Sequence, residues 1–260
     1  MHERPPPKLQ TTTLWYYPSQ QYGDEPMGDP RFAGRTPAYV IWNLLERYTR
    51  AGDLVIDPFC GGGTTLDVAR SLGRESKGFD LAPARADITR ADARALPLAS
   101  ASADFFFLDP PYSTHLSYSG ARSESGEPGD ADSAGAGCIG ELDAFEPGYL
   151  KALDAVFAEV ERCLKDRRYL AVYVSDTFKK KKGFVPIGAR LSFLLERRFR
   201  AVDHIAVVRG NRKLERPRFH RVAEEQNFFL RGFNHLLIFK KEQPAAPRAE
   251  ERSPRRGRRR

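Results

Sequence analysis

The sequence contains little cysteine, methionine and tryptophan: three Cys, two Met and two Trp in 260 residues. The cysteines (Cys60, Cys138 and Cys163) are scattered and odd in number, which argues against a disulfide framework and against a zinc site, so no metal is expected. No apolar run approaches the length that spans a bilayer, so no membrane association is expected. Residues 1–10 are proline-rich and charged and lack the apolar core of a secretory signal. These absences favour a protein of the reducing cytoplasm.

The rest of the composition is that of a folded domain. With 260 residues, of which 41% are hydrophobic, the chain is long enough for one large α/β core. Short apolar runs alternate with segments of helical periodicity, which predicts a doubly wound, mostly parallel Rossmann-like sheet with an antiparallel edge strand. The predicted strands are 54–56, 77–80, 88–92, 103–108, 169–174, 202–208 and 235–239. The predicted helices are 37–48, with Thr36 as its cap and Pro37 in its first position, 64–72, 149–164 and 187–198.

Composition and charge also divide the chain. Residues 1–13 are expected to be a disordered N-terminus, 14–242 a single domain, and 243–260 a disordered basic tail. Residues 117–140 are rich in Gly, Ser and acids and are expected to form a flexible acidic loop, whereas 165–168 are expected to form a turn.

One region, residues 178–221, is strongly basic. It contains fourteen Lys or Arg and three Asp or Glu. A solvated surface gives the same count, but an excess of this size attracts a polyanion. Nucleic acid is therefore the expected partner, and the candidate contacts are Lys179, Lys180, Lys181, Lys182, Arg212 and Lys213.

A glycine-rich loop follows the first predicted strand, in the segment Asp57-Pro58-Phe59-Cys60-Gly61-Gly62-Gly63-Thr64-Thr65. Glycine has no Cβ, so a ligand can approach the backbone, and the N-terminus of the next helix offers free N–H groups to a carboxylate or phosphate. The loop is neither a Walker loop nor a full dinucleotide fingerprint. A tight strand-to-helix turn without a ligand gives the same pattern.

Two acids near the ends of the next predicted strands could complete a nucleoside site. Asp80 lies roughly twenty residues after the glycines, where a carboxylate can accept from both hydroxyls of a ribose. Asp92 could accept from an adenine amino group. The alternatives are that Asp80 caps the following segment and that Asp92 is an ordinary surface acid.

A second special turn, Asp109-Pro110-Pro111-Tyr112, follows the apolar run 105–108. Two consecutive prolines fix the backbone and remove two N–H donors, which leaves carbonyl oxygens without local competition. One N–H of an exocyclic amine can then donate to the Asp109 carboxylate and the other to the Pro110 carbonyl. Tyr112 can stack on the planar ring that carries the amine. A proline-stabilised turn with Tyr112 as packing is the structural alternative.

The glycine segment followed by Asp109-Pro110-Pro111-Tyr112 resembles the paired signature of the amino-group DNA methyltransferases, which methylate adenine N6 or cytosine N4 with S-adenosylmethionine. The upstream segment, from 14–20 through 32–37, is similar to the family element that precedes the glycine motif and closes over the methionine end of the cofactor. The resemblance implies a cytoplasmic, nucleoid-associated enzyme of DNA methylation and restriction–modification, and a catalytic turn at 109–112. It assigns cofactor binding to Asp57, Phe59, Cys60, Gly61, Gly63, Thr64, Asp80, Leu81, Asp92 and Ala93.

Within that family, adenine N6 is the expected target, because members that act on cytosine N4 more often carry serine at the position of Asp109. Methylation of guanine N2 in RNA and a non-catalytic nucleic-acid-binding module are the alternatives. A covalent role for Cys60 is not expected, because this residue lies inside the cofactor loop.

Overall fold

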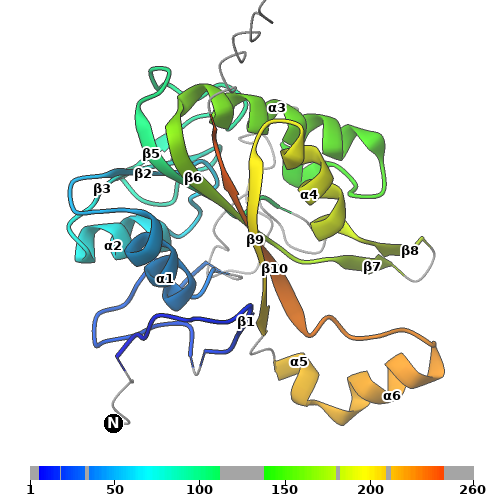
Figure 1. The fold of residues 1–260 in the computed structure, drawn as a ribbon. Helices are drawn as coiled ribbons and strands as arrows, with labels where there is room; N and C mark the ends of the chain where they lie inside the picture. The colour runs from blue at the N-terminus through cyan, green and yellow to red at the C-terminus, as the bar shows by residue number, and fades with distance from the viewer. Residues whose placement is uncertain are drawn as a thin grey trace, which may run out of the picture.

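The computed structural model describes residues 6–17, 19–32, 35–111, 138–179, 182–208 and 212–242. An eight-stranded sheet forms the centre of this part of the chain (Figure 1), with the strand order β1-β9-β10-β6-β5-β2-β3-β4. Its strands are β1 (Leu14–Trp15), β2 (Leu54–Asp57), β3 (Glu75–Asp80), β4 (Ile88–Arg90), β5 (Ala103–Leu108), β6 (Leu164–Val174), β9 (Arg200–Val208) and β10 (Phe233–Lys240). A separate antiparallel hairpin consists of β7 (Thr177–Lys179) and β8 (Gly183–Val185).

The sheet is mostly parallel, as predicted. Strands β4, β3, β2, β5 and β6 run parallel to one another. Strand β10 is antiparallel to both β6 and β9, which confirms an antiparallel pair toward one end of the sheet. Strand β1 pairs in parallel with β9 beyond this pair, so β10 lies between β6 and β9.

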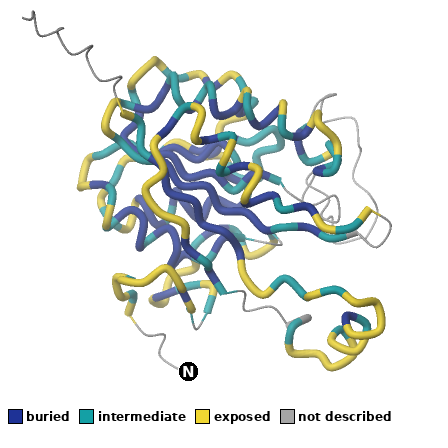
Figure 2. Tube along the Cα trace, turned by 45° about the vertical axis from the view of Figure 1, so that its right-hand side comes forward, coloured by how far each residue is buried: buried dark blue, intermediate teal, exposed yellow. Residues whose placement is uncertain are grey.

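Helices cover both faces of the sheet, which confirms the doubly wound class. Helices α1 (Ala38–Tyr48) and α2 (Thr64–Ser71) pack on one face, and α3 (Pro147–Cys163) and α4 (Ile187–Glu196) pack on the other. The short 3-10 helix η2 (Ile139–Glu141) precedes α3. All six residues of β5 are buried, because Phe105 and Phe107 face α1 while Phe106 and Leu108 face α3. Figure 2 shows this buried centre as the dark blue strands.

Two local predictions were wrong. Helix α1 begins at Ala38, with Pro37 as its N-cap and no side-chain cap, so Thr36 does not cap it. Residues 165–168, expected to form a turn, lie in β6, which follows α3 directly. This stretch is irregular: Arg167 has a φ of 64°, and the β5–β6 register shifts between Ala103 and Phe105. The predicted turn is therefore an irregular stretch within β6.

The carboxyl ends of β2, β3, β5 and β6 lie at one edge of the sheet, which is where ligands bind in open α/β folds. The segment between β9 and β10 leaves the sheet at the same edge, because His235 of β10 pairs with Val174 at the end of β6. That segment contains α5 (Arg212–Glu215) and α6 (Pro217–Glu225). Among the described residues, no helix has both the length and the apolar character needed to cross a bilayer.

Candidate active site

The two special turns of the sequence come together at the carboxyl edge of the sheet. Strands β2 and β5 are direct neighbours, with Val55 opposite Phe105 and Ile56 opposite Phe106. Asp57 ends β2, and Asp109 directly follows β5. Since neighbouring strands lie about 4.8 Å apart, the glycine loop and the proline turn start side by side.

The glycine loop uses left-handed backbone conformations that favour glycine. Gly61 has a φ of 48° and Gly63 a φ of 80°. The loop is closed by the Gly63 N–H, which donates to the Cys60 carbonyl at 2.8 Å, and is joined to β3 by the Cys60 N–H, which donates to the Phe79 carbonyl at 3.0 Å. Gly63 is also the N-cap of α2, and no side chain caps this helix. The first N–H groups of α2 can therefore serve an anion.

Part of the upstream segment lies on this loop. The Asp29 N–H donates to the Gly62 carbonyl at 2.7 Å. The ring of Phe32 lies 3.6 Å from where a Cβ on Gly61 would be. Arg85 approaches from another side, within 2.5 Å of an ideal Cβ on Gly63, and forms an ion pair of 2.8 Å with Asp67 of α2. The Phe32 ring is thus in ordinary contact distance and Arg85 is a flexible side chain, so the positive φ angles are the main reason for glycine at positions 61 and 63.

Asp57 is the most buried carboxyl group at this edge, with 4% exposure. Burial, opposed by the hydrogen bonds from Thr65 and Phe59 and assisted by the charge of Asp80, raises the pKa of Asp57 to about 7. Its Oδ2 accepts from Thr65 Oγ1 at 2.6 Å, and its Oδ1 accepts from the Phe59 N–H at 3.0 Å. Asp57 therefore shapes the loop from inside.

Asp80 is held at the end of β3 by two backbone amides. Its Oδ2 accepts from the Gly61 N–H and its Oδ1 from the Ala82 N–H, both at 2.9 Å. This arrangement fixes the carboxylate against the glycine loop, and each oxygen keeps a lone pair for a further donor. Leu81 follows Asp80 and is half-buried.

Asp92 is engaged by a neighbouring cation. Its carboxylate forms a two-pronged pair with the Arg94 guanidinium, with Nη2 at 2.5 Å from Oδ2 and Nε at 2.9 Å from Oδ1. The hydrogen bonds from Arg94 lower the pKa of Asp92 despite its burial. Ala93 is buried in the core beside β5. β4 ends at Arg90, two residues before Asp92.

Cys60 has a packing role in this structure. It is 5% exposed and forms a small cluster with Leu66 and Ile88. Its sulfur lies 2.3 Å from where a Cβ on Gly78 would be, so Gly78 of β3 makes room for it. Burial, with the nearby charges of Asp57 and Asp80, raises the pKa of the Cys60 thiol well above its usual value, which disfavours a nucleophilic thiolate.

The proline turn has a partner that sequence reasoning missed. Thr36 Oγ1 donates to Asp109 Oδ2 at 2.5 Å, and Thr36 is 8% exposed. The contact joins the segment before α1 to the end of β5 across 73 positions of sequence. Thr36-Pro37 reads locally as a helix start, so no sequence signal distinguishes a cap from this long-range contact. Pro110 is buried and Pro111 half-buried, while Tyr112 lies outside the described residues.

The predicted nucleic-acid contacts lie near this edge or outside the described residues. Lys179 ends β7, and Arg212 and Lys213 begin α5. Lys182 pairs with Asp143 at 2.7 Å, and the hydrogen bond to Asp143 raises the pKa of Lys182. Lys180 and Lys181 lie outside the described residues.

Comparison with known proteins agrees with this geometry. Residues 3–91 match the family model described as DNA methylase, N6_N4_Mtase. The Type II methyltransferase M2.DpnII of Streptococcus pneumoniae is 44% identical over 54 residues, which are 19% of this chain and 20% of that protein. The Type II methyltransferase M.MjaII of Methanocaldococcus jannaschii is 36% identical over 52 residues, which are 20% of this chain and 10% of that protein. The matched segments thus span a fifth or less of these relatives.

A solved structure supports the fold independently. The cyclase SpnF superposes with a TM-score of 0.50 over 83% of this chain and 87% of its own, at 15% identity, a likeness that concerns the fold alone. The fold is therefore that of a Rossmann-like, doubly wound α/β domain. Residues 3–91 are thus similar to the DNA methylase family of the N6_N4_Mtase model.

Proposed function

We propose that the protein is an S-adenosylmethionine-dependent DNA methyltransferase that methylates an exocyclic amino nitrogen, with adenine N6 as its target. The observation that carries this proposal is the position of Asp109 and Pro110 at the end of β5, beside the glycine loop at the end of β2. Such a neighbourhood can bring a methyl donor and an amine to one place.

The cofactor would be held mainly by backbone groups and by Asp80. The uncapped N-terminus of α2 suits a carboxylate, and the carboxylate of Asp80 is oriented by two amides toward the loop, where it suits a ribose diol. The bound cofactor supplies an electrophilic methyl group. Asp92, to whose two oxygens Arg94 already donates, would accept from the adenine amino group in competition with these bonds.

Asp109 and Pro110 would prepare the nucleophile. The Asp109 carboxylate and the Pro110 carbonyl would each accept a hydrogen bond from one of the two N–H groups of the amine. These bonds draw the nitrogen lone pair out of conjugation with the ring and aim it at the methyl carbon. Thr36 donates to Asp109 Oδ2 and so helps to orient this carboxylate at the end of β5. Tyr112 would stack on the base, which must leave the helical stack to reach this site.

The choice of adenine N6 over cytosine N4 rests on Asp109. A carboxylate is a stronger hydrogen-bond acceptor than a hydroxyl. In the family that the sequence resembles, members that act on cytosine N4 more often carry serine at this position, so aspartate favours adenine. The partner is DNA, and guanine N2 in RNA is the alternative substrate that the assay must separate.

The Asp109→Ala variant tests the proposal. Methyl incorporation into duplex DNA should fall by at least about 100-fold, since an oriented acceptor at the reacting atom is lost. S-adenosylmethionine binding, measured by calorimetry, should stay within twofold, and nucleoside mass spectrometry of the wild-type product should give N6-methyladenine.

Asp24→Ala, which alters an exposed carboxylate outside the site, is the matched control. Full activity of Asp109→Ala would overturn the role of Asp109, and methylation of RNA without methylation of DNA would overturn the substrate.

A further inference from the structure

The segment 212–232 between β9 and β10 carries little of the core. It leaves the sheet at the carboxyl edge, where Phe233 of β10 pairs with Val208 of β9, and α5 and α6 project away from the sheet in Figure 1. Only Ala223 of α6 is buried, and Figure 2 shows the segment mainly in the yellow of exposed residues. Its presence therefore requires an explanation other than packing.

Two contacts join this segment to the β7–β8 hairpin. The ring of Phe228 stacks on the ring of Phe178 of β7, with the two ring centroids 4.9 Å apart and an interplanar angle of 11°. The guanidinium of Arg231 lies over the ring of Phe184 of β8 at 5.0 Å. The hairpin directly follows β6, so both structures flank the candidate active site. We call residues 177–179, 182–185 and 212–232 together the basic wing.

The basic wing combines positive charge with exposed aromatic rings. Residues 212–232 contain six Lys or Arg and three Glu. Four phenylalanines of the described residues are largely exposed, and three of them, Phe184, Phe229 and Phe233, lie on the wing or directly after it. Phe229 is 86% exposed, the largest value among these exposed apolar side chains.

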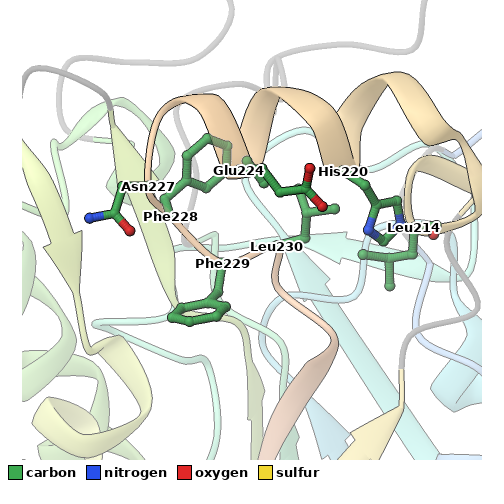
Figure 3. A pocket seen from close by; sticks show the side chains of 8 residues that line it. Leu214, His220, Glu224, Asn227, Phe228, Phe229 and Leu230 are labelled. Carbon is green, nitrogen blue, oxygen red and sulfur yellow. Dashed lines mark hydrogen bonds between the residues drawn. The ribbon is translucent and has the colours of Figure 1, made fainter.

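A hollow of about 580 Å³ lies between the helices of the wing. Its lining includes Leu214, His220 and Leu230, and Figure 3 shows Phe229 turned away from the neighbouring Phe228. His220 Nε2 donates to the Leu214 carbonyl at 2.6 Å, which links α6 to α5. Phe228 is thus anchored on the hairpin, while Phe229 remains available to a ligand.

We propose that the basic wing is the docking surface for duplex DNA, with Arg216 and Arg218 at the phosphates and Phe229 against bases or sugars next to the target. This inference rests on the proposed function and assigns the DNA contact to this chain's own residues. Arg216 and Arg218 are exposed at the start of α6. A cationic surface with exposed aromatic rings is what nucleic acid recognises, whereas a basic surface without them would favour phosphates alone.

The charge test compares two double reversals in the full chain. Arg216→Glu/Arg218→Glu alters the wing, and Lys151→Glu/Arg197→Glu alters α3 and the end of α4. Binding of labelled duplex DNA is measured by fluorescence anisotropy at several salt concentrations, without methylation. The wing variant should bind at least about tenfold more weakly. The slope of log affinity against log salt, which is negative, should become shallower by about 2. The control should lie within twofold of the wild type.

The aromatic test compares Phe229→Ala with Phe193→Ala. Phe193 is 73% exposed on α4, outside the wing, so the pair separates an aromatic contact from a general loss of exposed apolar surface. Removal of Phe229 should weaken DNA binding about fivefold or more with little change in salt slope, because a stacking contact carries no charge. Removal of Phe193 should have no effect.

The outcomes separate this inference from the proposed function. Unchanged DNA binding by both wing variants, with wild-type binding intact, overturns the wing but leaves methylation by Asp109 standing. Wing-dependent binding of duplex RNA but not DNA overturns DNA as the occupant, and a loss of self-association instead of DNA binding assigns the surface to a second copy. Calorimetric S-adenosylmethionine binding by each variant confirms that it is folded.

Discussion

Three aspartates at strand ends illustrate how the surroundings of a residue decide its role. Asp57 is enclosed and bonded to Thr65 and Phe59, so it shapes the loop. Asp80 is fixed by two amides and keeps lone pairs for a ligand. Asp109 is oriented by Thr36. The same residue type in the same kind of position thus braces the loop in one case and, as we propose, contacts the cofactor and the substrate in the other two.

The raised pKa of Asp57 predicts an unusual pH dependence of stability. A folded-state pKa of about 7, above the unfolded value of 3.8, means that the folded protein binds the proton more tightly. The stability from this group is therefore fully present below the unfolded pKa and is lost as the pH rises through 7. Between pH 5 and pH 8 the loss is on the order of 2–3 kcal/mol.

Asp57→Asn should remove that loss, since asparagine can still accept from Phe59 and contact Thr65. Urea unfolding at pH 5 and pH 8 should show that the variant gains on the order of 2–3 kcal/mol relative to the wild type on going to pH 8. Asp24→Asn should follow the wild type. Parallel pH profiles for wild type and Asp57→Asn would contradict a raised pKa.

At the scale of elements, the glycine loop joins β2, β3 and α2 and excludes side chains at specific points. Gly63 and Gly52 offer a matched pair, because their φ angles are 80° and 81°. A Cβ on Gly52 would meet nothing within 4 Å, whereas one on Gly63 would lie 2.5 Å from Arg85. An alanine would therefore cause the same backbone strain at position 52 as at position 63, but only at position 63 would its Cβ meet Arg85.

Gly52→Ala should cost about 1 kcal/mol of unfolding free energy, the strain of a left-handed alanine. Gly63→Ala should cost more and should weaken S-adenosylmethionine binding at least tenfold, because Arg85 must leave Asp67 and the loop must shift. Thermal unfolding and calorimetry measure the two effects. Equal losses of stability with unchanged cofactor binding in both variants would exclude a precise fit of the loop.

Most elements could be predicted from the sequence, because buried strands such as β5 are continuous apolar runs and α3 has a clear apolar stripe. The contacts between distant elements could not. Thr36 is a plausible cap in its local context, and only the folded chain places it beside Asp109. Likewise Arg94 is two residues from Asp92, and sequence alone does not determine whether its side chain turns back onto that acid.

At the scale of the whole molecule, the two edges of the sheet use their polar groups differently. At the carboxyl edge, Asp176 after β6 accepts from the Gly188 N–H of α4 and from His235 Nε2 of β10, each at 3.0 Å. His235 Nδ1 contacts His204 Nε2 of β9 at 2.8 Å. This network links the end of β6 with α4, β9 and β10, next to the point where the basic wing leaves the sheet.

At the amino edge, the charges stabilise the sheet itself. Asp104 of β5 is 3% exposed, and its carboxylate contacts Lys165 at 2.8 Å and Arg168 at 2.9 Å, both from β6. It also accepts from the Leu54 N–H of β2 at 3.0 Å. The charged residues in 165–168 therefore neutralise a carboxylate buried between three central strands.

Lys165→Met should destabilise the protein by about 1–2 kcal/mol at pH 7, less than a fully buried pair, because Lys165 is partly exposed and Arg168 remains. Burial of Asp104 opposes ionisation, but Lys165, Leu54 and Arg168 together lower the pKa of Asp104, so its contribution is present above the unfolded pKa and lost as the pH falls through the folded value. The cost of Lys165→Met should therefore shrink toward zero near pH 3. Adding Asp104→Asn should recover part of the loss at pH 7, since no buried charge is left to neutralise.

Urea unfolding at both pH values measures each effect, with Lys151→Met as an exposed control. If Lys165→Met has the same cost at pH 3 and at pH 7, Lys165 acts by packing and not by charge.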